Sequence, residues 1–290
     1  MLTIFAMPKP FDGHIGMIQR NAVTSWTLMS PRPEIILFGD EAGTAEIAKE
    51  LNLRHVADVK RNEKGTPFLN DLFEQAQKLA NFPVVSYVNA DIILFDDFIA
   101  AATRVAVWRT QFLMAGRRWD IDMTSSLNFA EKGWAQELRR DVMSRGKRRS
   151  ASWIDFFVFA RGMYRDMPPL LLGRVWWDNW LVWKALALGA PVVDASPCVL
   201  AVHQNHGYAH PGGFFGIWHG DEGQWNERLV NGGLDARTLR DANFKLGRFG
   251  VRTNWEAAIE RWWKSLSKNK NKRAPHEAAA SAVADAPKNE

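Results

Sequence analysis

Short apolar runs and segments of helical periodicity alternate along about the first 90 residues of the chain. The apolar runs predict buried strands at Leu2–Met7, Glu34–Phe38, Arg54–Val59 and Val84–Val88. Between them, apolar residues recur at helical spacing in Ile15–Leu28, Thr44–Leu51 and Pro67–Ala80. Strands that alternate with helices predict an α/β fold with a mostly parallel central sheet flanked by helices. Such sheets bind ligands at the carboxyl ends of their strands.

The alternation weakens after residue 110. Strands are predicted at Phe112–Arg117, Trp153–Phe159 and Pro191–Ala195, and helices at Asn128–Ser144, Trp180–Leu188 and Trp255–Leu266. Residues 145–149 are predicted to form a basic loop, and residues 203–220, rich in histidine, glycine and aromatics, a longer loop. The composition of residues 268–290, first Lys and Asn and then Ala, Pro and Glu, predicts a disordered tail.

Composition and charge exclude several classes of protein. Apolar residues make up 47% of the chain and charged residues 24%, as in folded soluble proteins. The net charge of +5 is too mild to indicate a nucleic-acid partner. A single cysteine, Cys198, excludes an intramolecular disulfide and fits a reducing compartment. The sequence has no apolar run long enough to cross a membrane and no secretory signal, so we expect a cytoplasmic protein, with peripheral contact at the inner face of the membrane left open.

The triplet Asn89-Ala90-Asp91 follows a predicted strand and precedes another apolar run. Side chains alternate along an extended chain, so we expect Asn89 and Asp91 to project to the same side. Their oxygens suit Mg²⁺ or Mn²⁺, and such a cation can hold a diphosphate. The alternative is an ordinary turn, in which Asn and Asp are common. The apolar flanks and the nearby acids Asp96 and Asp97 favour the functional interpretation.

Two more polar side chains follow the second and third predicted strands. Asp40 lies at the sheet edge where Asp91 is expected, and its carboxylate can accept hydrogen bonds from a nucleoside; the alternative is a cap for the next helix. Arg61 can hold a diphosphate, assisted by the positive end of the following helix. The alternative there is a solvated turn, with Gly65 for backbone freedom and Thr66 as N-cap.

A tryptophan-rich segment, Trp176–Trp180, opens the helix predicted after Gly173. A carboxylate held among Trp rings in a partly dry pocket has a raised pKa, which suits Asp178 for a general base. Trp177 and its neighbours offer a face on which a substrate can stack. The alternative role for Asp178 is a helix cap.

Three histidines, His203, His206 and His210, follow a predicted strand within eight residues. The glycines among and after them argue against a helical pair of metal ligands. In a loop, His203 or His206 can reach a metal held by Asp91. Polar surface histidines are the alternative, and a zinc site is disfavoured because no cysteine assists.

The order of these motifs along the chain resembles a GT-A glycosyltransferase of the nucleotide-diphospho-sugar transferase superfamily. The resemblance covers roughly residues 1–220 and implies a GT-A (Rossmann-like) fold. It implies that residues 1–110 bind the nucleotide-sugar and that residues 111–267 form the acceptor-binding and catalytic half of the same domain.

The resemblance also implies a role for each motif. Asp40 would contact the nucleoside, Arg61 the diphosphate or the base, and Asp178 would deprotonate the acceptor hydroxyl. Asp91, with Asn89 beside it, and His203 or His206 would bind Mg²⁺ or Mn²⁺. The triplet begins with Asn where the family pattern has Asp, which removes one charge. The implied activity is metal-assisted, inverting transfer of a hexosyl group from a nucleotide-diphosphate-sugar to a hydroxyl of a glycan or lipid-linked acceptor.

Two other functions remain alternatives. A nucleotidyltransferase that makes nucleotide-sugars would need a glycine-rich loop with Lys or Arg near the first strand, and Gly13-His14-Ile15-Gly16 is too sparse for that. A non-catalytic carbohydrate-binding protein would use the Trp residues to bind glycan and the acids to cap helices.

Overall fold

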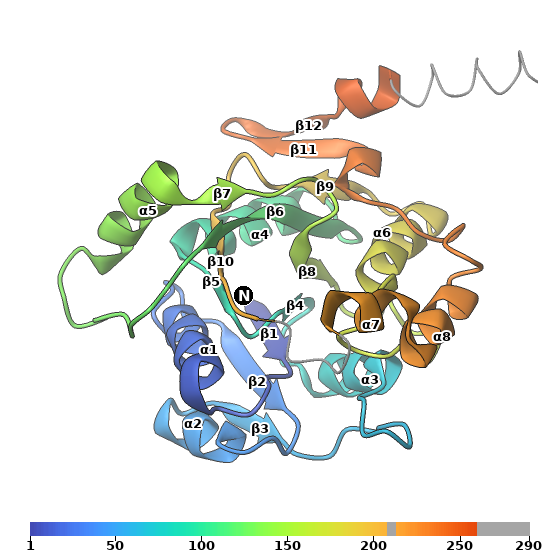
Figure 1. The fold of residues 1–290 in the computed structure, drawn as a ribbon. Helices are drawn as coiled ribbons and strands as arrows, with labels where there is room; N and C mark the ends of the chain where they lie inside the picture. Colours follow the sequence, from blue (N-terminus) through green and yellow to red (C-terminus); the bar gives the residue numbers. More distant parts are fainter. Residues whose placement is uncertain (208–212, 260–290) are drawn as a thin grey trace, which may run out of the picture.

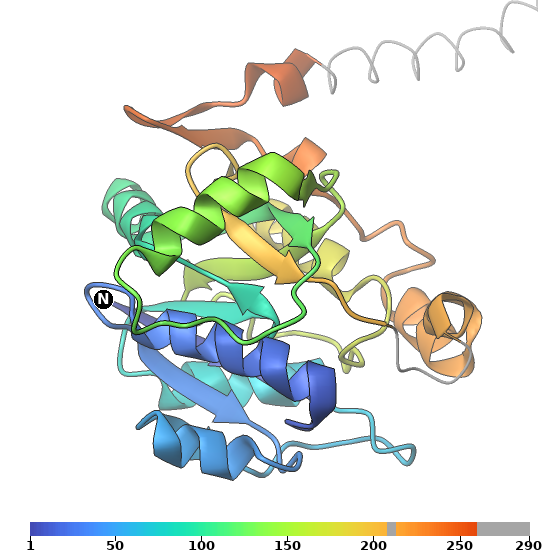
Figure 2. The same cartoon turned by 60° about the vertical axis from the view of Figure 1, so that its left-hand side comes forward.

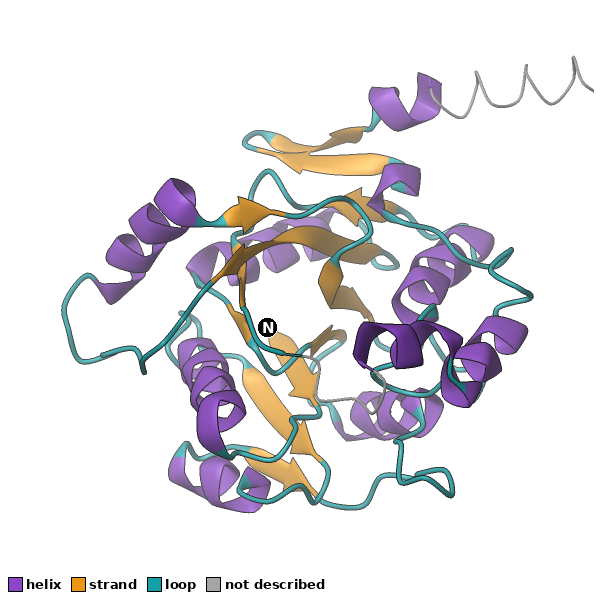
Figure 3. Cartoon of the chain, in the orientation of Figure 1, coloured by secondary structure: helices purple, strands orange, loops and turns teal. Residues whose placement is uncertain are grey.

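The protein, here a computed structural model, is described over residues 1–207 and 213–259. Helices cover both faces of a central sheet whose strand order is β12-β11-β9-β6-β8-β4-β1-β2-β3 (Figures 1 and 3). The sheet passes without a break from the first half of the chain to the second. The predicted α/β class, with a central sheet flanked by helices, is confirmed.

The first half of the sheet is parallel throughout. Its strands are β1 (Leu2–Ala6), β2 (Glu34–Phe38), β3 (Arg54–Val56) and β4 (Val84–Val88). They are connected by the helices α1 (Gly13–Thr27), α2 (Thr44–Glu50) and α3 (Leu69–Leu79). All seven elements predicted for this part of the chain are therefore confirmed, with differences only at their ends.

The second half of the sheet has mixed strand directions. β8 (Ile154–Ala160) runs antiparallel to both β4 and β6 (Leu113–Ile121), and β9 (Val192–Asp194) runs parallel to β6. The hairpin β11 (Phe244–Gly247) and β12 (Gly250–Thr253) extends the sheet beyond β9. A side branch contains β5 (Ile92–Ile93), β7 (Lys147–Arg148) and β10 (Ala201–Gln204), and β10 pairs with both β5 and β6.

The remaining helices pack around this second half. They are α4 (Asp96–Trp108), α5 (Trp134–Arg145), α6 (Trp177–Ala187), α7 (Gly213–His219), α8 (Asp221–Leu229) and the short 3₁₀ helix η1 (Leu239–Asp241). Among the described residues, no helix combines the length and the apolar character needed to cross a membrane.

The core lies on both faces of the sheet because side chains alternate along each strand. On β1, Ile4 packs into the layer that contains Trp26 of α1, and Phe5 packs into the opposite layer. There Phe5 meets Phe73 of α3 edge-on, and Phe73 stacks on Phe159 with ring centroids 5.6 Å apart. Both layers hold the carboxyl ends of β1 and β4 in fixed positions.

Several predictions for the second half need correction. Residues 203–220 are not one loop, since His203 lies on β10 and α7 occupies 213–219. The basic loop 145–149 contains the short strand β7, and residues 96–108 form a helix that was not predicted. Residues 255–259 are helical as expected. The rest of the helix predicted to Leu266, the predicted tail 268–290 and His210 lie outside the described residues.

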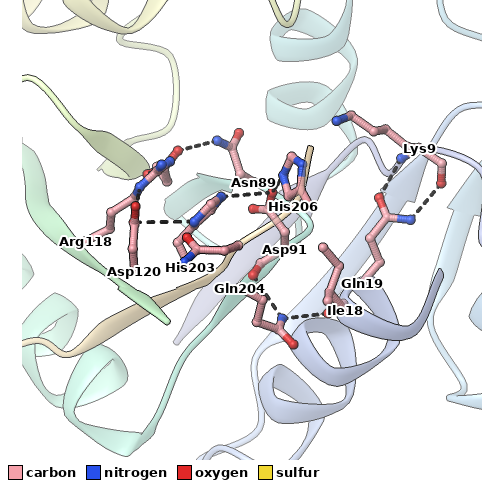
Figure 4. Close-up of polar contacts among 12 residues, drawn as sticks. Lys9, Ile18, Gln19, Asn89, Asp91, Arg118, Asp120, His203, Gln204 and His206 are labelled. Atoms are coloured by element: carbon pink, nitrogen blue, oxygen red, sulfur yellow. Dashed lines mark hydrogen bonds and ion pairs between the residues drawn. The ribbon is translucent and has the colours of Figure 1, made fainter. Parts of the chain in front are cut away.

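A buried amide network fixes β10 against the turn that follows β4. The Gln204 side chain, with 0% exposure, donates to the carbonyl oxygens of Ile18 at 2.7 Å and Asp91 at 3.0 Å (Figure 4). Its own oxygen accepts from Asn21 Nδ2 at 2.9 Å, and Asn21 Oδ1 accepts from the Leu127 backbone at 3.0 Å. Because buried polar groups are costly to leave unpaired, these bonds join α1, β10 and the turn into one unit.

We predict that Gln204→Met lowers the free energy of unfolding by roughly 2–4 kcal/mol, since an apolar side chain of similar size removes the buried hydrogen bonds to Ile18 O, Asp91 O and Asn21 Nδ2. Urea denaturation of the full chain measures this. The matched control is Gln224→Met on α8, where the side chain is exposed and the expected change is within about 0.5 kcal/mol. Equal losses in the two variants would contradict a structural role for the network.

Candidate active site

A cavity of about 840 Å³ opens at the carboxyl ends of β1 and β4. The amino end of β8 reaches the same edge because β8 runs antiparallel to β4. Eight side chains were singled out from the sequence, and seven of them line this cavity: Arg61, Asn89, Asp91, Trp177, Asp178, His203 and His206. Asp40 is the one that does not. The fold thus brings together groups that lie more than 100 residues apart in the chain.

Asp91, His203 and His206 form a cluster whose ligand atoms all lie within 4.8 Å of one another. Asp91 Oδ2 is 2.9 Å from His206 Nε2 and 3.7 Å from His203 Nε2. Figure 4 shows the three side chains turned toward one another from β10, the segment after it and the turn after β4. Both histidines named as alternative metal ligands therefore stand beside the carboxylate.

The cluster fits a divalent cation. Among the described residues, the buried Oδ1 of Asp91 has no hydrogen-bond partner, and Oδ2 of the same carboxylate lies beside two imidazoles. Burial alone would raise the pKa of Asp91, but the hydrogen bond with His206 and the charges of His203 and Arg118 outweigh it and hold the pKa at about 2. An ionised carboxylate with two imidazoles is a donor set that transition-metal cations bind.

A second layer of charged groups supports His203. Asp120 Oδ1 lies 3.4 Å from His203 Nδ1, which leaves Nε2 directed toward Asp91 (Figure 4). Arg118 holds Asp120 at 2.8 Å and Asp155 at 3.0 Å. Burial opposes ionisation of Asp120, but His203 and Arg118 lower its pKa well below the usual range. The contact between Asp120 and His203 is an ion-pair distance without hydrogen-bond geometry, so Asp120 acts on the histidine through its charge.

The two polar residues of the 89–91 triplet do not lie on an extended chain as predicted. Residues 90 and 91 form a turn, closed by a hydrogen bond from the Ile92 backbone to Asn89 O at 3.1 Å. Asn89 Nδ2 donates to Asp155 Oδ1 at 2.6 Å, whereas Asp91 faces the histidines. Both side chains reach the cavity, but the turn gives them different neighbours.

Asp40 projects to solvent, with 74% of its side chain exposed. It bonds to Arg61 Nη2 at 2.9 Å, and Glu41 bonds to the same nitrogen at the same distance. Glu41 is 16% exposed, lines the cavity and has a buried Oε2 without a hydrogen-bond partner. The acid that faces the cavity from the segment after β2 is therefore Glu41, one residue beyond the predicted one.

Asp178 lies in the first turn of α6 and lines the cavity. The N-cap of this helix is Trp176, and no side chain makes a capping hydrogen bond there, so Asp178 is not the helix cap. Burial raises the pKa of Asp178 to about 7, and the backbone hydrogen bond from Asn179 offsets only part of that effect. Such a carboxylate exchanges protons readily near neutral pH.

The tryptophans beside Asp178 have different roles. Trp177 is 6% exposed, and its ring packs edge-on against Tyr87 at 5.3 Å, so it belongs largely to the core. Trp176 is half-buried, and its backbone has a φ of 76°, a conformation that bulky residues rarely adopt. Its ring lies edge-on to Trp218 with centroids 5.7 Å apart, and both rings line the cavity. Trp176 therefore offers the more accessible face.

Four charged residues of the cavity region were not predicted from the sequence: Asp120, Asp155, Arg118 and Glu41. Arg118 and Asp120 lie two apart near the end of β6, so strand alternation turns both to one face, and this pattern was available in the sequence. Asp155 gave no such signal. It reaches the site only because β8 runs antiparallel and starts at this edge.

In comparisons with known proteins, no family model and no curated protein matches the chain. Solved structures to which it is similar include S. aureus TarS 1–349 in complex with UDP-GlcNAc (TM-score 0.46, 13% identity, 71% of this chain and 59% of that one). Others are mannosyltransferase PcManGT from Pyrobaculum calidifontis in complex with GDP-Man and Mn²⁺ (0.45, 12%, 70% and 56%) and glucosyl-3-phosphoglycerate synthase from Mycobacterium tuberculosis (0.44, 12%, 71% and 72%). The chain spans less than two thirds of the TarS and PcManGT structures. These similarities are low, so the function proposed below rests on the site residues.

We predict that His203→Ala and His206→Ala each weaken Mn²⁺ binding by at least roughly 10–100-fold. Loss of a residue that only supports a metal ligand typically has an effect of that size, and these two histidines are proposed as ligands themselves. Asp120→Asn should weaken it within that range, because Asp120 acts only through His203. Isothermal titration of the full chain with Mn²⁺ measures the affinities. His55→Gln on β3, which lies outside the cavity, is the matched control and should bind as the wild type does.

The affinity for Mn²⁺ should fall with decreasing pH. The hydrogen bond with Asp91 raises the pKa of His206 above its ordinary value, so a proton competes with the metal up to a higher pH than at an isolated histidine. If His206→Ala binds Mn²⁺ as tightly as the wild type, or if the wild-type affinity does not fall at low pH, His206 is not a metal ligand.

Proposed function

We propose that this protein is a glycosyltransferase that moves a sugar from a nucleotide-diphosphate-sugar to a hydroxyl acceptor. One observation carries the proposal: the cluster Asp91–His203–His206 and the carboxylate of Asp178 line the same cavity. Sugar transfer needs a group that stabilises a departing diphosphate and a group that accepts a proton. This cavity offers both, at the edge of the sheet where α/β proteins bind nucleotides.

Asp91, His203 and His206 would hold the cation. Two imidazoles beside one carboxylate favour Mn²⁺ over Mg²⁺, which prefers oxygen ligands and octahedral geometry. A bound cation supplies charge neutralisation for the leaving nucleoside diphosphate.

Lys9 and Arg61 also line the cavity, and their positive charges suit the diphosphate. The Lys9 loop is held in place by Gln19, which bonds to the Lys9 backbone N–H at 2.6 Å and to its carbonyl at 2.8 Å (Figure 4). Arg61 is held by Glu41 on the neighbouring wall. In this proposal Lys9 and Arg61 bind phosphate oxygens, and the unpaired oxygen of Glu41 accepts a hydrogen bond from the nucleoside. Residues 1–110 would thus form most of the donor side.

Asp178 would act as the general base. Its carboxylate takes the proton from the acceptor hydroxyl while that oxygen attacks the anomeric carbon and the bond to the diphosphate breaks. Attack in a single step from the face opposite the leaving group inverts the anomeric centre. The acceptor then lies beside α6, in the part of the cavity lined by described residues after 110, in line with the expected acceptor-binding role of the second half of the chain.

Trp176 and Trp218 would bind the acceptor. Behind the Trp176 ring lies Gly233, where an added Cβ would come within 3.3 Å of that ring, so the backbone supports one face of the indole closely. The strained backbone at Trp176 orients the ring two residues from the proposed base. Indole faces stack on the apolar faces of sugar rings, so we propose a glycan or a lipid-linked saccharide as the acceptor.

The direct test of the proposed function incubates the protein with a panel of nucleotide-sugars, Mn²⁺ and saccharide acceptors. Release of nucleoside diphosphate together with a glycosylated acceptor supports the proposal. Release of pyrophosphate from a nucleoside triphosphate and a sugar phosphate would instead indicate a nucleotidyltransferase. Saccharide binding without turnover of any donor would indicate a carbohydrate-binding protein.

We predict that Asp178→Asn removes turnover but leaves donor binding intact, which thermal stabilisation by UDP or GDP with Mn²⁺ measures. In the wild type, kcat should fall as the pH drops below about 7, because the base is then protonated. Normal turnover in Asp178→Asn would exclude this base.

The stability of the same variant separates a catalytic role from a structural one. The folded-state pKa of Asp178 lies above its unfolded value, so the wild type loses stability as the pH rises toward 7 and Asp178 ionises. Asp178→Asn cannot ionise. We therefore expect it to melt at a higher temperature than the wild type at pH 8, even though it is inactive.

We predict that Trp176→Ala raises KM for the acceptor by about tenfold, in line with the loss of one aromatic stacking contact, and leaves KM for the donor unchanged. Initial-rate measurements with each substrate varied in turn give both values. Trp176→Phe should recover part of the loss, and Trp225→Ala, an exposed indole on α8, is the matched control. An equal rise in both KM values would contradict an acceptor-specific role.

A further inference from the structure

The β11–β12 hairpin carries an almost fully exposed aromatic side chain at its tip. Phe249 is 98% exposed, and it follows Arg248, which is also exposed. α4 supports the tip, because Arg104 donates to the carbonyl oxygens of Gly247 at 2.6 Å and Arg248 at 3.0 Å. The hairpin stands at one end of the molecule in both Figure 1 and Figure 2. Phe249 therefore projects into solvent from a turn that hydrogen bonds from Arg104 stabilise.

The helix that follows the hairpin directs its apolar stripe away from the protein. Trp255 is 71% exposed and Ile259 54%, and their spacing of four places them on one helical face. Ala257, with 4% exposure, faces the protein instead. In the sequence, the same spacing continues with Trp262, Trp263 and Leu266. A stripe of this kind normally packs on a protein core, but here its first two members face solvent.

Basic residues accompany these apolar side chains. Arg248 and Arg252 are exposed beside Phe249 on the hairpin. Further along the sequence, residues 260–273 contain six Lys or Arg and one acid, Glu260. Trp, Ile and Phe combined with Lys and Arg are typical of segments that lie in the interface of an anionic membrane.

We propose that an edge patch, formed by Arg248, Phe249, Arg252, Trp255 and Ile259, binds the surface of an anionic lipid bilayer. The aromatic and aliphatic side chains enter the boundary between headgroups and acyl chains, and the arginines pair with lipid phosphates. The patch belongs to the turn between β11 and β12, to β12 and to the helix after it, whereas the cavity opens at the ends of β1 and β4. Binding to a membrane would therefore leave the cavity accessible.

The charge of the patch favours a bilayer over a second copy of the chain as its partner. In a self-complementary contact the positive charges of Arg248 and Arg252 of two copies would oppose association, and the exposed acid Glu256 beside Trp255 already pairs with Lys245 at 2.6 Å. An anionic bilayer attracts both arginines at once.

Co-sedimentation of the full chain with lipid vesicles, without substrates, tests the proposal independently of any catalytic activity. We expect binding to mixed phosphatidylcholine–phosphatidylglycerol vesicles, weaker binding at high salt and little binding to pure phosphatidylcholine. The Phe249→Ser/Trp255→Ser variant should lose at least about tenfold in partitioning. Arg248→Gln/Arg252→Gln should bind anionic vesicles more weakly and lose much of the salt dependence.

Leu234→Ser is the matched control, because Leu234 is 71% exposed and lies outside the edge patch; it should bind as the wild type does. Equal thermal unfolding of all variants shows that they fold. The proposal is overturned if the wild type fails to bind anionic vesicles or if Phe249→Ser/Trp255→Ser binds them as tightly. It is also overturned if light scattering finds a wild-type dimer that Trp255→Ser dissociates.

Discussion

The site depends on one buried side chain, the amide of Gln204. Its two donated hydrogen bonds hold β10 to α1 and to the backbone of Asp91. His203 precedes it by one residue and His206 follows it by two, so fixing Gln204 also fixes where both imidazoles stand relative to the carboxylate. Because an unpaired buried amide is costly, this arrangement is strongly favoured over any slip of the strand.

Around this unit, acidic and basic side chains form successive pairs, beginning at Asp91 and continuing behind His203. Asp91 stands with two histidines, and Asp120 lies behind one of them. Arg118 joins Asp120 to Asp155. These contacts keep Asp91 and Asp120 ionised in spite of their burial. At Asp178, backbone hydrogen bonds offset only part of the effect of burial, which raises the pKa to about 7. One cavity therefore holds a carboxylate suited to a cation and another suited to a proton, which is the division of roles that the proposed sugar transfer requires.

Sequence patterns predicted elements correctly where the pattern lies within one segment. They failed where the structure depends on contacts with segments distant in the sequence. The strands and helices up to Val88 followed directly from apolar periodicity. The segment with His203 was predicted as a loop, because a strand of four residues paired to β5 and β6 has no long apolar run of its own. Asp40 was named from the sequence and Glu41 was not considered, and nothing in the order of residues indicates which of two adjacent acids turns inward.

The sequence by itself determined the alternating order of elements up to Val88, and with it a parallel sheet that has Asp91 just beyond the end of one strand. Periodicity and chain connectivity suffice for this, because they act over a few residues at a time. Only the tertiary structure decided which oxygen is left unpaired, which tryptophan faces the cavity and that Asp155 arrives from an antiparallel strand. Those outcomes depend on packing between segments that are distant in the sequence, and neither composition nor residue spacing within one segment determines that packing.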